Sequence, residues 1–165
     1  MFDEDFKAVY DAASELVRDF IDLLYLTGQR PSDVLKMSRK DIQDGVLYVR
    51  QGKTDEPIRM AIKGRLTEVI ERITARKVTA MRLVVAEDGQ PLALRGIEAR
   101  FRKAARSGGS KFQLRDLRAK AGTDKAEKTG DIRKAQAQLG HTSVKMSETY
   151  IRSRGETVDP NRINK

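Results

Sequence analysis

Residues 20–33 read F-I-D-L-L-Y-L-T-G-Q-R-P-S-D, and this stretch decides the fold. The first seven residues are apolar apart from Asp22, so we expect a helix segment that is buried on nearly every side. Thr27-Gly28 ends this helix, because glycine adopts the left-handed conformation of a helix C-cap without strain. Pro31 suits the first turn of a new helix and keeps the residue before it extended. Arg30 is therefore predicted to lie in a rigid corner between two helices.

Outward from this corner, hydrophobic residues recur at three- and four-residue steps and predict a series of helices. Strand composition at 46–49 and apolar alternation over 58–62, with a polar bend between them, predict a small antiparallel sheet. The fold class is mainly α with this small antiparallel β-sheet (α+β), in one domain over 1–151. The tail, 152–165, is polar and without periodicity, so we expect it to be mobile in a monomer. The predicted helices cover 4–27, 32–37, 65–77, 96–106, 114–128, 132–139 and 144–151.

Composition limits the classes of function. The chain has 165 residues, 33 Lys and Arg against 24 Asp and Glu, and a net charge of +9, which favours a polyanionic partner such as nucleic acid. Cysteine is absent, which excludes disulfides, Cys-ligated zinc and thiol catalysis. His141 is the single histidine, so a His-cluster metal site is excluded. Apolar runs are far shorter than the ~20 residues that span a bilayer. We expect a cytoplasmic protein with no cofactor and no membrane partner.

Five short motifs occur in a fixed order. They are T-G-Q-R-P-S-D at 27–33, G-K-T at 52–54, L-R-D-L-R at 114–118, L-G-H at 139–141 and the tyrosine of S-E-T-Y-I-R, Tyr150. Taken singly, each has an ordinary explanation, such as a surface arginine, a solvated turn lysine or a core tyrosine. In this order and spacing, from about residue 10 to 155, they resemble the catalytic domain of the tyrosine recombinases, the phage integrase family.

The resemblance implies a metal-free transesterification on DNA. Arg30 and Arg118 match the two arginines that clamp the scissile phosphate, a task that suits a guanidinium because it forms two hydrogen bonds and stays charged. Tyr150 matches the nucleophile, which forms a 3′-phosphotyrosine intermediate. Lys53 matches the general acid that protonates the departing 5′ oxygen, and a 5′ hydroxyl from another strand then reverses the step.

Two further positions match the family and one departs from it. Asp33 matches the acidic residue that supports the arginines, and His141 matches a residue that hydrogen-bonds the phosphate. Arg115 stands where relatives usually carry histidine. An arginine cannot act as a general base at neutral pH, although it can still donate hydrogen bonds to a phosphate oxygen. The predicted catalytic set is therefore Arg30, Lys53, Arg115, Arg118, His141 and Tyr150.

The predicted partner is double-stranded DNA, with self-association into a recombination assembly on it. The basic segment at 95–106 is a candidate DNA-contacting surface through Arg95, Arg100, Arg102, Lys103 and Arg106. The resemblance also leads us to expect a site-specific recombinase or integrase of a phage or mobile element, in this chain without the family's N-terminal DNA-binding domain. A lone catalytic domain should bind DNA weakly, with strong salt dependence.

Three other functions remain open. The departure at Arg115 is compatible with a catalytically silent DNA-binding module of the same fold. The same chemistry on a single site would relax a plasmid, as a type IB topoisomerase does. An RNA-binding domain is disfavoured, because aromatic residues make up only 5% of the chain.

Overall fold

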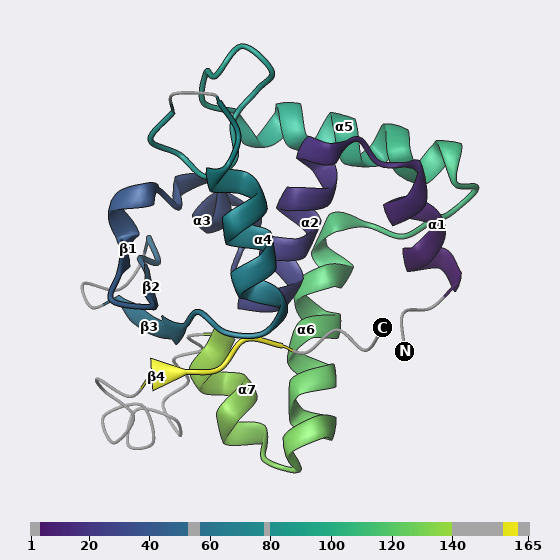
Figure 1. Cartoon of the computed structure of the whole chain (residues 1–165). Helices are drawn as coiled ribbons and strands as arrows, with labels where there is room; N and C mark the ends of the chain where they lie inside the picture. The colour runs from purple at the N-terminus through teal and green to yellow at the C-terminus, as the bar shows by residue number, and fades with distance from the viewer. Residues whose placement is uncertain (1–3, 53–56, 78–79, 140–156, 162–165) are drawn as a thin grey trace.

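The computed structural model describes residues 4–52, 57–77, 80–139 and 157–161. The structure is mainly helical, with one small sheet at an edge of the molecule (Figure 1). Together with one 3₁₀ turn, Arg39–Asp41, the elements are α1 Glu4–Ala12, α2 Glu15–Thr27, α3 Pro31–Lys36, β1 Ile42–Gln43, β2 Val46–Val49, β3 Ile58–Ala61, α4 Arg65–Thr74, α5 Leu94–Ser107, α6 Leu114–Thr129, α7 Ile132–Leu139 and β4 Thr157–Val158. The predicted helix at 144–151 lies outside the described residues.

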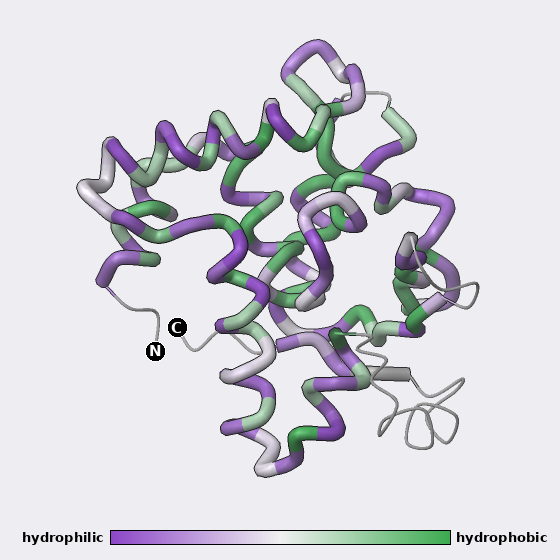
Figure 2. The backbone as a smooth tube through the Cα atoms, turned by 180° about the vertical axis from the view of Figure 1, so that it is seen from behind, coloured by the Kyte–Doolittle hydropathy of each residue, from purple (hydrophilic) through white to green (hydrophobic). Residues whose placement is uncertain are grey.

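Helix α2 is the centre of the core. All of its residues from Asp19 to Thr27 are buried, as the apolar sequence predicts. Helices α3, α4, α5 and α6 all pack against it. Figure 2 shows the outer helices, such as α5, as alternating hydrophilic and hydrophobic stretches, because each buries only one face. The buried C-terminal half of α2 therefore fixes where the corner at Arg30 lies.

The prediction of a single helix over 4–27 is wrong: the structure has two helices there, α1 and α2, with a helix break between them. Ser14 has an extended backbone (φ −66°, ψ 162°) and precedes the first turn of α2. Arg18 spans the break, with Nε donating to the Tyr10 carbonyl at 2.9 Å and Nη2 donating to the Asp11 carbonyl at 2.8 Å. The Tyr10 carbonyl also accepts from the Ala13 N–H at 3.2 Å, so the guanidinium adds to the backbone hydrogen bonding at the C-terminal end of α1.

The sheet has the order β1-β2-β3-β4. The predicted antiparallel part is confirmed, with Val46 opposite Ala61 and Val49 opposite Ile58. Asp44 and Gly45 make the tight turn between β1 and β2, both with positive φ (50° and 72°). This turn suits a two-residue hairpin because its twist matches that of the strands. Strand β4 adds a parallel neighbour to β3, which the sequence did not predict.

The C-terminal segment corrects a second expectation. Asn161 is 4% exposed, and its side-chain amide donates to the Tyr25 carbonyl at 2.9 Å and to the Ala121 carbonyl at 3.2 Å. Its backbone N–H donates to the Leu26 carbonyl at 3.1 Å. The expected mobile tail is therefore wrong for residues 157–161: Thr157–Val158 pairs with β3, and Asn161 bonds backbone carbonyls of α2 and α6, contacts that polarity alone does not reveal.

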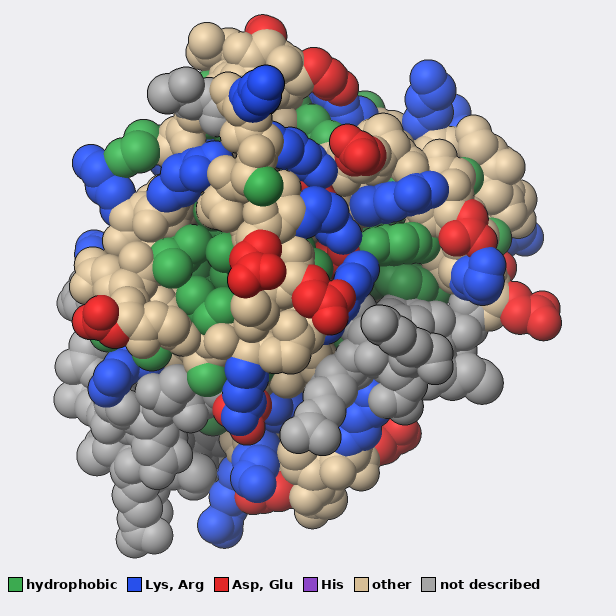
Figure 3. Space-filling model, viewed as in Figure 1, with side chains coloured by type: hydrophobic (Ala, Val, Ile, Leu, Met, Phe, Trp, Pro, Cys, Tyr) green, Lys and Arg blue, Asp and Glu red, His purple; other side chains and the backbone are tan. Residues whose placement is uncertain are grey.

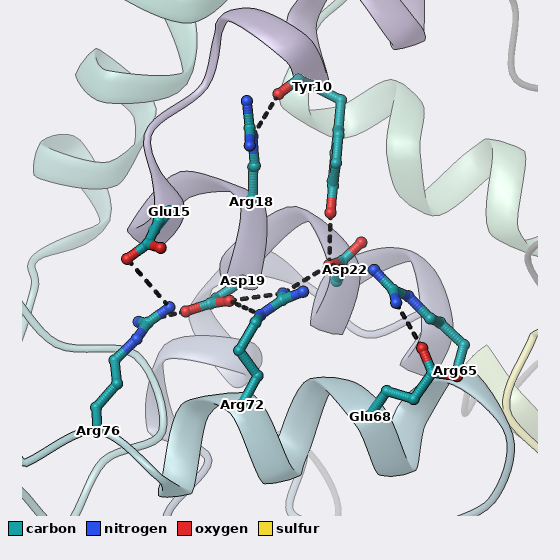
Figure 4. A network of polar contacts seen from close by, with 9 residues as sticks. All are labelled: Tyr10, Glu15, Arg18, Asp19, Asp22, Arg65, Glu68, Arg72 and Arg76. Atoms are coloured by element: carbon teal, nitrogen blue, oxygen red, sulfur yellow. Dashed lines mark hydrogen bonds and ion pairs between the residues drawn. The ribbon is translucent and has the colours of Figure 1, made fainter.

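A buried ionic network joins α2 to α4 (Figure 4). Asp19 and Asp22 are each 2% exposed. Arg72 of α4 bonds both carboxylates, at 2.6 Å to Asp19 and 2.8 Å to Asp22, and Arg76 pairs with Asp19. Burial raises the pKa of Asp22, while the hydrogen bonds from Arg72 and Tyr10 oppose that rise. Arg65, at the start of α4, lies 3.8 Å from Asp22, so all three arginines of α4 and its C-terminal end pair with a carboxylate of α2. Among the described residues, no helix is both long and apolar enough to cross a membrane.

Candidate phosphate-binding site

The corner between α2 and α3 has the predicted geometry. Gly28 caps α2 in the left-handed conformation (φ 67°), and its N–H donates to the Leu24 carbonyl at 2.9 Å. Arg30 is extended (φ −70°, ψ 148°), and Pro31 opens α3. A Cβ at Gly28 would lie 2.9 Å from Cδ2 of Leu139, so close packing also requires glycine here. Arg30 is thus held at a fixed turn against the end of α7.

Arg118 of α6 joins Arg30 and Asp33 at this corner. Its side chain is half-buried, and Nη2 donates to the Leu139 carbonyl at 2.8 Å. Burial lowers the pKa of Arg118, the positive charge of Arg30 lowers it further, and the negative charge of Asp33 opposes both. Leu139 links Arg118 to the corner, because its carbonyl accepts from Arg118 and its side chain lies against Gly28, two residues before Arg30. The fold thus brings the α6 residue Arg118 to the turn that carries Arg30 and Asp33.

The charges at this corner favour an anion. Two guanidinium groups and one carboxylate sum to +1, in a site where Asp33 is 3% exposed. The Asp33 Oδ2 atom has no hydrogen-bond partner within the parts of the chain that the structure describes. Two arginines beside each other repel until an anion lies between them, and a phosphate accepts two hydrogen bonds from each. These charges would suit a phosphate, and Arg30 and Arg118 are called the clamp below.

Three buried glutamines surround the clamp, and the sequence prediction missed them. Gln29, Gln51 and Gln138 are each at most 5% exposed. Gln51 donates to Gln29 Oε1 at 2.6 Å and to the Leu139 carbonyl at 2.9 Å, and Gln138 donates to the Leu26 carbonyl at 2.9 Å. Gln29 and Gln51 stand inside or beside two of the motifs quoted above, one residue before Arg30 and two before Lys53. A polar residue directly after a buried helix was the signal that could have revealed Gln29.

A basic hollow of about 360 Å³ opens beside Asp33. Its cationic side chains come from four places in the sequence, which is why no motif predicts it. The virtual Cβ of Gly52 would lie 3.8 Å from Lys36 Nζ, so the hollow also adjoins the segment that leads to Lys53. The cations that line it are Lys36, Lys40, Arg50 and Arg82.

Comparison with known proteins matches this geometry to a family. The family model described as "Phage integrase family" matches residues 3–156. The chain belongs to this family. The integrase of Escherichia phage HK022 is 28% identical over 98% of this chain and 49% of its own length, and that of Escherichia phage lambda is 27% identical over 94% and 48%. The chain thus spans about half the length of the curated relatives it matches.

Solved structures of integrases have the same fold. The lambda integrase catalytic core has a TM-score of 0.73 at 25% identity, covering 84% of this chain and 92% of that one. A lambda integrase dimer bound to a COC′ core site has a TM-score of 0.75, covering 87% and 57%. The XerA recombinase, at 23% identity, has a TM-score of 0.71 and shares the fold.

Of the remaining residues of the predicted phage integrase site, the structure describes only Arg115. Arg115 is on the first turn of α6, one turn before Arg118, with its side chain 81% exposed and Nε 4.0 Å from Asp116 Oδ1. Its ion pair within the described residues is with Asp116 and not with the clamp, so its role as a phosphate donor stays a prediction. Lys53, His141 and Tyr150 lie outside the described residues. Gln51, two residues before Lys53, and Leu139, two residues before His141, meet through the hydrogen bond given above.

The predicted DNA-contacting helix lies away from the clamp. Helix α5 crosses the end of the molecule opposite α7 (Figure 1), and Arg100 pairs there with Glu87 at 3.0 Å. On the face shown in Figure 3, Lys and Arg side chains form a band in the upper part, interleaved with Asp and Glu. Carboxylates near these cations weaken their attraction for a polyanion. The contact of Arg95, Arg102, Lys103 and Arg106 with DNA stays a prediction.

Proposed function

We propose that this phage integrase domain breaks and rejoins DNA strands through a 3′-phosphotyrosine intermediate. The observation that carries the proposal is that Leu139 links Arg118 to the turn at Arg30: its carbonyl accepts from Arg118 Nη2 at 2.8 Å, and its side chain lies against Gly28. From this link we expect one phosphate to bind both guanidinium groups. Stabilising the negative charge on the non-bridging oxygens is worth about 3–4 kcal/mol for one well-placed donor. Because its substrate would be the DNA of a bacterial cell, the protein would act in the cytoplasm.

The reaction needs three groups besides the clamp. The phenol oxygen of Tyr150 would attack phosphorus and lose its proton, and the bond from phosphorus to the 5′ oxygen would break. Lys53 would give that oxygen its proton, and His141 would donate a hydrogen bond to the phosphate. The clamp supplies fixed positive charge to the transition state. The hollow lined by Lys36, Lys40, Arg50 and Arg82 would hold the neighbouring backbone phosphates.

A pool of nicked duplexes with random sequence around the nick tests this proposal. The short strand between the cleaved bond and the nick, which carries the new 5′ hydroxyl, diffuses away after cleavage, so a covalent protein–DNA adduct accumulates and can be sequenced. We expect adducts from the parent in excess EDTA and none from Tyr150→Phe, with DNA affinity unchanged within about twofold. Tyr48→Phe is the matched control, since it removes the same hydroxyl from a half-buried strand tyrosine and should leave the adduct intact.

Each alternative gives a different result. DNA binding without any adduct would indicate that the chain is a catalytically silent DNA-binding module and not an enzyme. Relaxation of a one-site plasmid without exchange between two sites would indicate topoisomerase activity. An adduct that forms with Tyr150→Phe, or only with a divalent cation, would contradict the mechanism.

A further inference from the structure

One backbone carbonyl lies at the meeting point of the predicted site. The Leu139 carbonyl accepts from Arg118 Nη2 at 2.8 Å and from Gln51 Nε2 at 2.9 Å. A carbonyl oxygen has two lone pairs, so both of its acceptor positions are used. Leu139 ends α7, two residues before His141. Through this atom, the arginine clamp touches the segments that lead to Lys53 and to His141.

The glutamine pair extends this contact to Arg30. Gln51 Nε2 uses its second hydrogen on Gln29 Oε1, at 2.6 Å. Gln29 Nε2 in turn donates to the Thr27 carbonyl at 3.0 Å and to the Gln138 carbonyl. Every amide hydrogen of both side chains is therefore used. Gln29 is fully buried and adjoins Arg30, so the network reaches both arginines of the clamp.

Stability alone does not explain this network. A buried hydrogen bond contributes only about 0.5–1.5 kcal/mol net, and apolar side chains of similar volume in place of all the partners could be equally stable. A satisfied polar network does define a unique arrangement, because each donor has one direction. What it fixes here is the relation of three segments that share no sequence neighbourhood.

We propose that Gln51 is a positioning residue for the general acid: it fixes the start of the Lys53 segment to the Leu139 carbonyl, which also holds Arg118. Proton transfer to the leaving 5′ oxygen requires Lys53 to stand at hydrogen-bond distance from a phosphate that the arginines have placed. The Leu139 carbonyl, as an anchor shared by Arg118 and Gln51, would relate the phosphate-binding arginine to the segment that leads to Lys53. This inference rests on the proposed function.

The test compares leaving groups. Lys53→Ala should slow cleavage of an ordinary duplex by ~10²–10⁴-fold. A duplex with sulfur at the bridging 5′ position should recover most of that loss, because a thiolate leaves without a proton. Gln51→Met has similar length and no donor, and we expect it to slow the oxygen duplex by ~10–10²-fold, as a displacement of about 1 Å can. On the sulfur duplex it should cleave within about threefold of the parent.

Controls separate positioning from folding. Gln43→Met changes the same side chain at an exposed position of β1 and should cleave both duplexes like the parent. DNA affinity and thermal unfolding are measured for each variant. If Gln51→Met does not fold, Gln51→Asn is used, which keeps an amide on a shorter side chain. We expect it to slow cleavage of the oxygen duplex by a smaller factor and to recover on the sulfur duplex in the same way.

The outcomes are distinct. Recovery by sulfur for Gln51→Met, as for Lys53→Ala, supports the inference. Equal slowing on oxygen and sulfur, or parental rates on both, overturns it while the proposed function stands. A parent chain that forms no adduct on either duplex overturns the proposed function and this inference with it.

Discussion

At the scale of single residues, Asp33 is the buried charge that most affects the clamp. Its carboxylate lies beside Arg118 and counters the repulsion between Arg118 and Arg30. Because its Oδ2 atom has no partner in the described chain, its contribution is the field it exerts on the two guanidinium groups. Removing that charge should loosen the arginines without removing either.

We therefore expect Asp33→Asn to separate binding from cleavage. Cleavage on the nicked duplex should fall by ~10–10²-fold, because the arginines no longer hold one geometry. DNA affinity should stay equal or rise, since the site gains one positive charge. Asp44→Asn is the control: it makes the same charge change in an exposed turn and should alter neither measurement. Equal effects of the two substitutions would contradict a local role for Asp33.

The residues of the site divide into those a motif can predict and those it cannot. Arg30 follows from Gly28 and Pro31, whose backbone preferences set the corner before any packing is considered. Gln51 does not, because its partners, Gln29 and Leu139, lie 22 and 88 residues away. A buried hydrogen bond between distant segments leaves no periodic trace in a sequence.

At the scale of elements, the sequence predicted most of the described helices and the α2–α3 corner, but it predicted neither the break between α1 and α2 nor strand β4. The apolar stripe of α1 continues in phase into α2 through Ala13, so periodicity could not show the break at Ser14. Strand β4 has only two residues, and its partner β3 lies about a hundred positions earlier in the sequence. Neither its length nor its hydrophobic pattern could therefore predict a strand there. Short elements that exist because of a distant partner are the ones that sequence reasoning misses.

The packing of α1 against α5 depends on one glycine. A Cβ at Gly108 would lie 2.5 Å from the Ala8 carbonyl oxygen, which is backbone and cannot turn aside. Gly108→Ala should lower the free energy of unfolding by about 1–3 kcal/mol. Gly96→Ala, on the same helix with its nearest atoms at 3.8 Å, should be neutral or more stable by up to about 1 kcal/mol. Chemical denaturation compares them, and equal stabilities would contradict this account.

At the scale of the whole molecule, Asn161 ties the described C-terminal end to α2 and α6. Asn161→Ala leaves the Tyr25 and Ala121 carbonyls without this donor, and should lower stability by about 1–3 kcal/mol. For a chain of this size, the midpoint of thermal unfolding should fall by roughly 3–9 °C.

Lys63→Ala provides the contrast. It removes a contact of the same segment, the ion pair with Asp159 at 2.6 Å, whose two side chains are each 54% exposed. An exposed pair contributes about 0–1 kcal/mol, so the midpoint should move by no more than about 4 °C. If Asn161→Ala were the milder change, the segment would be held by surface charge and not by its buried amide.

The parallel strand β4 also sets how far the predicted nucleophile can travel. Tyr150 stands seven residues before Thr157, which β3 holds, so its Cα cannot lie more than roughly 25 Å from that strand. One phenol confined to a sphere of that radius has an effective concentration on the order of tens of millimolar, whatever the concentration of the protein. Without that strand pairing, the remaining tether would be Leu139, eleven residues away, and the accessible volume would grow roughly fourfold. The pairing of Thr157 and Val158 with β3 would thus raise the effective concentration of Tyr150, the predicted nucleophile.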